Sequence, residues 1–271
     1  MRFCLSPLFF KTMAPRAFCE LCAGLGVGPS VLLHDDHWLT GASLKKELPK
    51  YLDLVRENGL EPGLVSVPNH VESLVQDTTV LEVLRDNGIH IVRLGQQKRI
   101  GFDARMLGLM VRRHAIHAAK LAQQFGLTFL FHIRQGMYPH NATAAYHMVE
   151  DMNPAQVQVM IDPGESPFGG SEDIFYQCDL LNEFVGAVGL RDTAVARTGE
   201  KSNDQKGWVR KAAPGHDGLT NWVETANALK SIGFGGLYEI EPCYDTDNLK
   251  VLVQKLKMEI QYFRQVFGAQ D

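Results

Sequence analysis

The chain has 271 residues, a formal net charge of -4 and a sequence pI near 6.2. Hydrophobic residues make up 45% of it and charged residues 21%, which is an ordinary globular balance. Lysines and arginines form no basic stripe, so the composition disfavours a nucleic-acid partner. No apolar run approaches the roughly 20 residues of a membrane span, so we expect no membrane partner.

The number and spacing of the cysteines indicate the cellular compartment. Five cysteines stand at positions 4, 19, 22, 178 and 243. An odd number without a regular framework favours a reducing compartment, so we expect a cytoplasmic protein. Cys19 and Cys22 form a CxxC without a thioredoxin-like context, and we interpret them as two residues of one helix. The first fifteen residues are apolar only briefly, which predicts a first strand rather than a signal peptide.

Strand-like apolar runs alternate with helix-like segments along the whole chain. Asp103 and Gly126 mark the two ends of one helix, and Asn221 with Glu224 forms a capping box at the start of another. Alternating βα units predict a parallel sheet with right-handed crossovers. Eight units in this length predict an α/β fold, a single (β/α)₈ TIM barrel domain over residues 1–271. The predicted strands are Phe3–Pro7, Gly28–His34, Gly63–Pro68, Ile89–Leu94, Leu127–Arg134, Val157–Asp162, Val185–Arg191 and Gly236–Glu241.

One connection is unusually long. Asp192 to Thr220 follows the seventh predicted strand and is rich in Gly, Lys and Asp. Connections of this length are often functional, so two interpretations stay open: a lid over the barrel, or an exposed loop. Lys211 and His216 lie on it, and we treat them as candidate substrate-binding residues.

Strand phase selects a group of polar side chains. Because side chains on a strand alternate between two faces, the branched apolar set faces the helices and the other set faces the barrel interior. The interior set carries its polar members at the carboxyl end of each strand. Enzymes with this fold place their chemistry at that end. The predicted group is His132, Arg134, Asp162, Arg191, Glu239 and Glu241, with Arg93 of ambiguous phase.

The residue types in this group fit two tasks. Carboxylates with a histidine can hold a divalent cation, and they can move protons at a carbon beside a carbonyl. We therefore predict Glu241, His132 and Glu239 as catalytic residues. Arg134 and Arg191 are predicted to bind an anionic substrate group through paired hydrogen bonds. Glu165 is a further carboxylate at the rim, without an assigned role.

Four stretches carry a resemblance to a known family. They are VMIDPGE at 159–165, VGLRDT at 188–193, PGHDGLTNW at 214–222 and GFGGLYEIEP at 233–242. In order and spacing the chain resembles the xylose-isomerase-like TIM barrels, the sugar-phosphate isomerase/epimerase superfamily. The resemblance implies a small sugar or sugar-phosphate substrate, isomerase, epimerase or lyase chemistry, and a homo-oligomer.

The resemblance also implies a metal site, but the match to it is incomplete. Metal-dependent members take Glu, Asp, His and Glu from strands five to eight. Asp162 and Glu241 match, His132 stands at the strand-five position, and Gly189 stands at the strand-seven position and offers no ligand. A divalent ion (Mn, Mg, Co or Zn) bound by Asp162, Glu241 and His132 is therefore an expectation with one ligand missing.

Two functional interpretations stay open. In the first, the chain is an isomerase, epimerase or lyase with an altered or weak metal site, and Glu241 is the base. In the second, it is a metal-free member, either a catalyst that uses Glu241, Glu239 and arginines or a carbohydrate- or anion-binding protein without turnover. The DNA-repair branch of the family needs several zinc ions and DNA affinity, which the missing ligand and the acidic balance disfavour.

Overall fold

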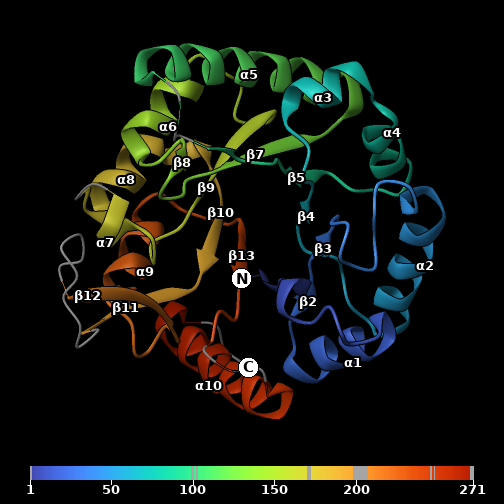
Figure 1. Ribbon diagram of the computed structural model, residues 1–271, viewed down its shortest axis with the longest axis vertical. Coiled ribbons are helices and arrows are strands. Elements are labelled where there is room, and N and C mark those ends of the chain that lie inside the picture. Colours follow the sequence, from blue (N-terminus) through green and yellow to red (C-terminus); the bar gives the residue numbers. More distant parts are fainter. Residues whose placement is uncertain are drawn as a thin grey trace.

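A ring of parallel strands forms the centre of the computed structural model, which describes residues 2–98, 101, 103–169, 172–197, 207–244, 246 and 248–268 (Figure 1). Its nine strands are hydrogen-bonded in the order β2-β1-β13-β10-β9-β7-β5-β4-β3. They are β1 (Arg2–Leu5), β2 (Gly28–Pro29), β3 (Val31–Leu32), β4 (Val65–Ser66), β5 (Ile91–Arg93), β7 (Thr128–His132), β9 (Val157–Ile161), β10 (Val185–Leu190) and β13 (Leu237–Ile240).

The two edges of this sheet are neighbours in the chain. Only Ser30 separates β2 from β3, and its N–H donates to the Leu5 carbonyl, while the Val31 N–H donates to the Leu64 carbonyl. The run of residues 28–32 therefore pairs with β1 on one side and β4 on the other, which closes the ring. This confirms the predicted barrel, with β2 and β3 together forming its second strand.

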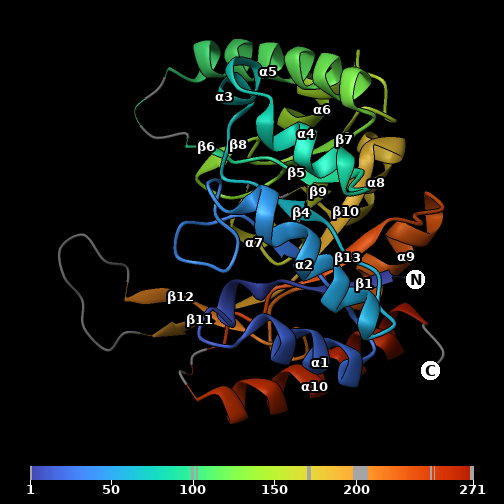
Figure 2. The same ribbon diagram turned by 90° about the vertical axis from the view of Figure 1, so that its right-hand side faces the viewer.

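Helices surround the ring and cover its outer face (Figures 1 and 2). Several end as the sequence predicts: Asp103 accepts from two N–H groups at the start of α5, Gly126 ends α5 at φ 66°, and Asn221 accepts from Glu224 at the start of α9. The helices are α1 (Pro15–Leu25), α2 (Leu44–Glu57), α3 (Val71–Gln76), α4 (Thr79–Asp86), α5 (Ala104–Phe125), α6 (Ala142–Val149), α7 (Ser166–Gly169), α8 (Ile174–Leu181), α9 (Trp222–Ser231) and α10 (Leu249–Phe267), with 3-10 turns at Pro7–Phe9 and Asn182–Phe184.

The core has two parts, as the strand phase predicts. Phe129, Val159 and Ile240 belong to the large cluster between the sheet and the helices. A small inner cluster fills the ring itself and consists of Leu64, Leu130, Met160, Ala187 and Leu237. Because the inner cluster fills the barrel, the polar residues at the strand ends lie on a packed apolar floor.

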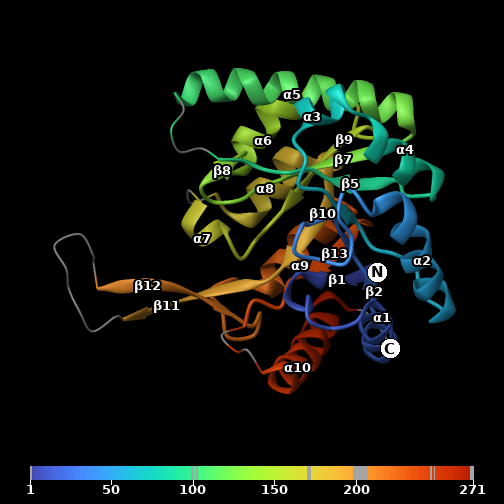
Figure 3. The same cartoon turned by 45° about the vertical axis from the view of Figure 1, so that its right-hand side comes forward.

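The connection after β10 differs from the prediction of a loop. It contains two antiparallel strands, β11 (Asp192–Arg197) and β12 (Trp208–Ala213), which form an arm that projects from the barrel (Figures 2 and 3). Thr, Val and Trp at these positions favour strands. The sequence does not predict the strands clearly because Gly and Lys are frequent around these residues. A second small ladder joins β6 (Gln97–Lys98) to β8 (Met137–Tyr138). Among the described residues, no helix is both long and apolar enough to span a membrane.

Candidate active site

The predicted polar residues converge at the carboxyl ends of neighbouring strands. His132 ends β7, Asp162 follows β9, Arg191 follows β10 and Glu241 follows β13. Glu239 lies two residues before Glu241 and therefore faces the same way. These five side chains keep between 1% and 8% of their surface exposed, so they are buried. Together with Arg93 and Glu165 they form what we call the mouth network.

Arg191 lies at the centre of the mouth network. Its Nε donates to Asp162 Oδ2 at 2.6 Å, and its Nη2 donates to Glu165 Oε1 at 2.5 Å. Its Nη1 lies 3.4 Å from Glu241 Oε2. Burial alone would lower the pKa of Arg191, but the three carboxylates raise it well above its usual range. The guanidinium is therefore permanently charged and is compensated from three sides.

Arg93 provides a second cation from β5. Its Nη1 donates to Glu239 Oε2 and also to Glu241 Oε1, the latter at 3.2 Å. The register of β5 with β7 pairs Arg93 with Leu130, a member of the inner cluster, so Arg93 faces inward. Glu241 therefore lies between two guanidiniums, one on each of its oxygens.

His132 and Asp162 form a hydrogen-bonded pair. His132 Nε2 lies 3.2 Å from Asp162 Oδ2. Burial lowers the pKa of His132, although Asp162 raises it, so the imidazole is neutral at pH 7. In the tautomer that fits this contact, Nε2–H donates to the carboxylate and Nδ1 is an acceptor. A carboxylate also orients the histidine base of a Ser-His-Asp triad, but there the two ring nitrogens have the opposite roles.

The pKa values of the buried carboxyl groups differ because their surroundings differ. Burial would raise the pKa of Asp162 and that of Glu241, but the neighbouring guanidiniums lower both pKa values below the ordinary range. Burial raises the pKa of Glu239 to about 6, although Arg93 opposes the shift. Glu239 is thus the carboxyl of the three that is closest to half protonation near neutral pH.

The arm joins the mouth network at the rim. Arg210 of β12 lies 2.6 Å from Glu165 Oε1 through its Nη2 and donates to Gln135 Oε1 at 2.6 Å. Arg134 approaches the same carboxylate oxygen more loosely, at 3.9 Å, and 39% of its side chain is exposed. Glu165 therefore ties the arm to Arg191, a role that the sequence did not reveal.

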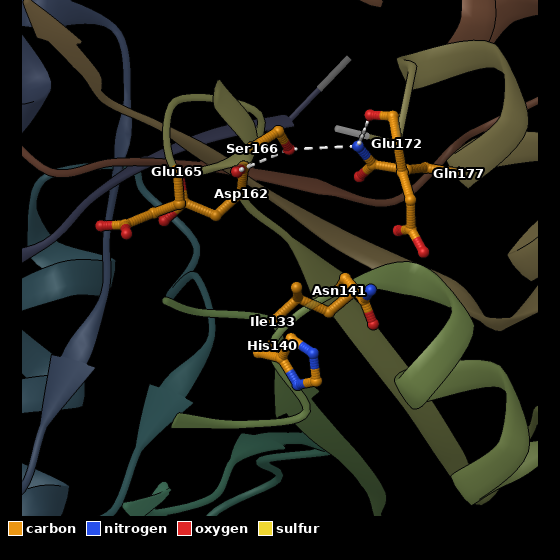
Figure 4. A pocket seen from close by; sticks show the side chains of 8 residues that line it. All are labelled: Ile133, His140, Asn141, Asp162, Glu165, Ser166, Glu172 and Gln177. Atoms are coloured by element: carbon orange, nitrogen blue, oxygen red, sulfur yellow. Dashed lines mark hydrogen bonds between the residues drawn. The ribbon is translucent and has the colours of Figure 1, made fainter. Parts of the chain in front are cut away.

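A small pocket lies beside the mouth network, between the β7–α6 and β9–α7 connections and α8 (Figure 4). Gln177 Nε2 donates to Ser166 Oγ at 3.1 Å, and Ser166 Oγ lies 3.5 Å from the Asp162 carbonyl oxygen. Asp162 and Glu165 line this pocket on one side, and His140 and Asn141 lie on the other. Next to it a groove of about 310 Å³ runs from Pro163 past Ser166 to the start of α9.

Comparison with known proteins gives a likeness in structure. No protein-family model matches the sequence, and no curated protein matches it significantly. A D-psicose 3-epimerase from Clostridium cellulolyticum H10, solved with D-tagatose, superposes with a TM-score of 0.75 at 15% identity over 98% of this chain and 99% of that one. The chain has the fold of the xylose-isomerase-like TIM barrels.

Two further solved structures with this fold are reported with a metal. The IolI protein with a zinc atom matches at a TM-score of 0.73 and 17% identity, over 98% of this chain and 99% of that one. A xylose isomerase-like TIM barrel protein from Mycobacterium smegmatis in complex with magnesium matches at 0.68 and 14%, over 98% and 97%. At these identities the likeness establishes the fold, and the chemistry has to be argued from the residues of this chain.

These residues do not fit a divalent metal. Asp162 Oδ2 accepts from both Arg191 and His132, and both Glu241 oxygens face guanidiniums. Asp162 Oδ1 and Glu239 Oε1 are buried without a hydrogen-bond partner in the described part of the chain, but neither is surrounded by ligands. Within that part, no group of three or more His, Cys, Asp or Glu is arranged to hold a metal. The metal-binding roles of Asp162, Glu241 and His132 stay predictions that these contacts disfavour.

Two predicted substrate-binding residues lie elsewhere. Lys211 follows Arg210 on β12 and so points to the opposite face of the arm from Glu165. His216 is exposed and packs edge-on against Tyr262 of α10, with ring centroids 5.9 Å apart. The structure does not bring either residue to the mouth network, and their binding roles stay predictions.

Proposed function

We propose that this protein is an isomerase- or epimerase-like enzyme that moves a proton at a carbon beside the carbonyl of a small sugar or sugar phosphate. The observation that carries the proposal is the His132–Asp162 pair, a neutral imidazole held by a buried carboxylate at 3.2 Å. It lies at the barrel end where enzymes of this fold work. An epimerase with this fold was solved with a ketose, which supports the substrate class.

In this proposal His132 is the base, oriented by Asp162. Glu241 is the base that the sequence suggests, but its two oxygens face Arg93 and Arg191, and its lowered pKa makes it a weak proton acceptor. Its part is to fix the two guanidiniums. Arg93 and Arg191 are placed to stabilise negative charge that develops on a substrate oxygen when the carbon loses its proton. Glu239, with a pKa of about 6, is a candidate proton donor.

Proton abstraction can be measured without knowing the product. D-Tagatose, D-fructose and fructose 6-phosphate are incubated with the protein in D₂O, and deuterium at the carbons beside the carbonyl is followed by NMR. We expect incorporation with at least one of these ketoses, slowed on the order of 10²- to 10⁴-fold by His132→Asn. His147→Asn removes an exposed histidine side chain on α6 and should leave the exchange rate unchanged.

An undiminished rate in folded His132→Asn would remove the histidine base from the proposal. Absence of exchange with every ketose, together with saturable binding of one of them, would favour the alternative function. That alternative is a sugar- or small-anion-binding protein without turnover. One observation favours it: Asp162, Glu165, Glu239 and Glu241 are all buried and ion-paired, as in a network that only closes the barrel.

Three further properties stay predictions: a cytoplasmic location, a homo-oligomeric state and a single domain over 1–271. Light scattering of the purified chain would report the oligomeric state.

A further inference from the structure

Carboxylates from two strand ends and one connection meet at a single cation in this barrel. Asp162 follows β9, Glu165 lies three residues later, and Glu241 follows β13, yet all three contact Arg191. Several carboxylates converging on one positive centre is the arrangement typical of a divalent metal site. Here the positive centre is a side chain, and the three contacts engage its Nε, Nη1 and Nη2.

Gly189 explains how the guanidinium fits. It lies two residues before Arg191, so both residues face the barrel interior. A Cβ at Gly189 would lie 3.3 Å from Asp162 Cγ and from Oδ2, so a longer side chain at 189 would start against the carboxylate that Arg191 binds. A residue with a metal-binding side chain at position 189 would add a second metal ligand beside Asp162. Glycine has no side chain and supplies none.

The guanidiniums already paired with these carboxylates also oppose a metal ion at this point. Arg93 on β5 and Arg191 supply two positive charges, and each of them contacts Glu241. A divalent ion bound to Asp162 Oδ1 would have to lie close to the Arg191 guanidinium, which binds the other oxygen of the same carboxylate. Two positive charges that share one buried carboxylate repel each other strongly, because little solvent screens them there.

We propose that the guanidinium of Arg191 occupies the place of a divalent metal ion among the mouth carboxylates, and that Gly189 and Arg191 together keep this site metal-free. The inference goes beyond the proposed function and holds whether or not the protein turns over a substrate. It assigns a specificity role to two residues: one removes a ligand, and the other supplies the cation that the carboxylates require.

The first experiment is a calorimetric titration of chelator-treated wild-type protein with MnCl₂, repeated with CoCl₂ while the visible absorption of Co²⁺ is recorded. We expect no saturable binding below about 1 mM, which corresponds to less than about 4 kcal/mol of binding free energy. One Mn²⁺ or Co²⁺ per chain at micromolar concentration, with the intense visible bands of low-coordinate Co²⁺, would overturn the proposal.

The second experiment tests the two residues. Gly189→His/Arg191→Met restores a ligand and removes the cation, and it should bind Mn²⁺ or Co²⁺ at least about 100-fold more tightly than wild type. Arg191→Lys keeps the charge and should stay metal-free. Arg112→Met is the matched control, because Arg112 also pairs with two acids, Glu150 and Asp151, but at an exposed site.

Circular dichroism checks the fold of each variant. If the Met variant does not fold, Gly189→His/Arg191→Gln replaces it, because glutamine keeps hydrogen-bond donors for the carboxylates. A folded double variant that binds metal no better than wild type would overturn the role of the two residues. The same outcome follows if Arg112→Met gains as much binding. The metal titrations do not involve turnover, so their failure is distinct from a failure of the ketose exchange assay.

Discussion

The two halves of the barrel mouth differ in how they treat buried polar groups. The first half, from β1 to β4, buries the hydroxyls of Ser6, Ser30 and Ser66, of which the last two lack a hydrogen-bond partner among the described residues. The second half, from β5 to β13, buries five carboxylates: four contact arginines, and the fifth, Asp192, accepts hydrogen bonds from Thr220 and Trp222. An unpaired hydroxyl costs a few kcal/mol at most, whereas an unpaired buried charge costs far more, so only the charged half needs a network.

Because the charged half depends on arginine contacts, we expect the largest loss of stability when Arg191 is replaced. Arg191→Met leaves Asp162, Glu165 and Glu241 buried without their shared partner, so the free energy of unfolding should fall by about 3–5 kcal/mol. Urea unfolding at pH 7 measures this loss. Arg112→Met on the surface should cost no more than about 1 kcal/mol. Equal small losses in both variants would show that the network adds little stability.

A buried acid without an arginine contact gives an intermediate effect. Glu259 of α10 accepts from the Gly215 N–H at 2.7 Å and from the Tyr244 hydroxyl, and burial raises its pKa to about 7, although both donors lower it. The folded protein therefore holds a proton that the unfolded chain releases at its ordinary pKa of 4.5. Stability from this group is complete below pH 4.5 and is lost as the pH rises towards 7.

Glu259→Gln should remove this pH dependence. The decrease in unfolding free energy between pH 5 and pH 8 should be smaller in the variant than in wild type by on the order of 2–3 kcal/mol, at about 1.4 kcal/mol per pKa unit. Urea unfolding at the two pH values measures it, with Glu57→Gln on the exposed surface as the control. Parallel pH profiles for wild type and Glu259→Gln would contradict the assignment.

We expect the smallest change in stability for a substitution in the uncharged half, from β1 to β4. Ser66→Ala removes a buried hydroxyl that has no hydrogen-bond partner among the described residues, so stability should stay within about 1 kcal/mol of wild type or rise slightly. Thermal unfolding is sufficient to measure it. A loss above about 2 kcal/mol would mean that Ser66 has a partner, such as an ordered water, and that the two halves differ less than we argue.

The sequence predicted the parts of this arrangement that follow from local periodicity. Alternation along β7, β9 and β13 placed His132, Asp162, Glu239 and Glu241 on the inner face, and the structure confirms that placement. Arg93 stayed ambiguous because β5 has three residues, and its phase follows from its register with Leu130. Periodicity within one strand carries no information on pairing between distant segments.

Contacts between distant segments are what the sequence did not reveal. The Glu165–Arg210 contact joins residues 45 positions apart: one lies on the β9–α7 connection, and the other lies on an arm for which the sequence predicts no strands. The proposed exclusion of a metal ion is a similar case. A missing ligand at Gly189 was visible in the sequence, but the occupation of Asp162, Glu165 and Glu241 by one guanidinium depends on side-chain geometry.

We propose that His132 moves the proton at this site and that an arginine, with no metal ion, provides the positive charge. Deuterium exchange into the ketose that the wild-type protein accepts, measured before and after exhaustive EDTA treatment, tests both parts together. We predict equal exchange rates in the two samples and no increase on adding Mn²⁺. Exchange that disappears with EDTA and returns with Mn²⁺ would contradict the account.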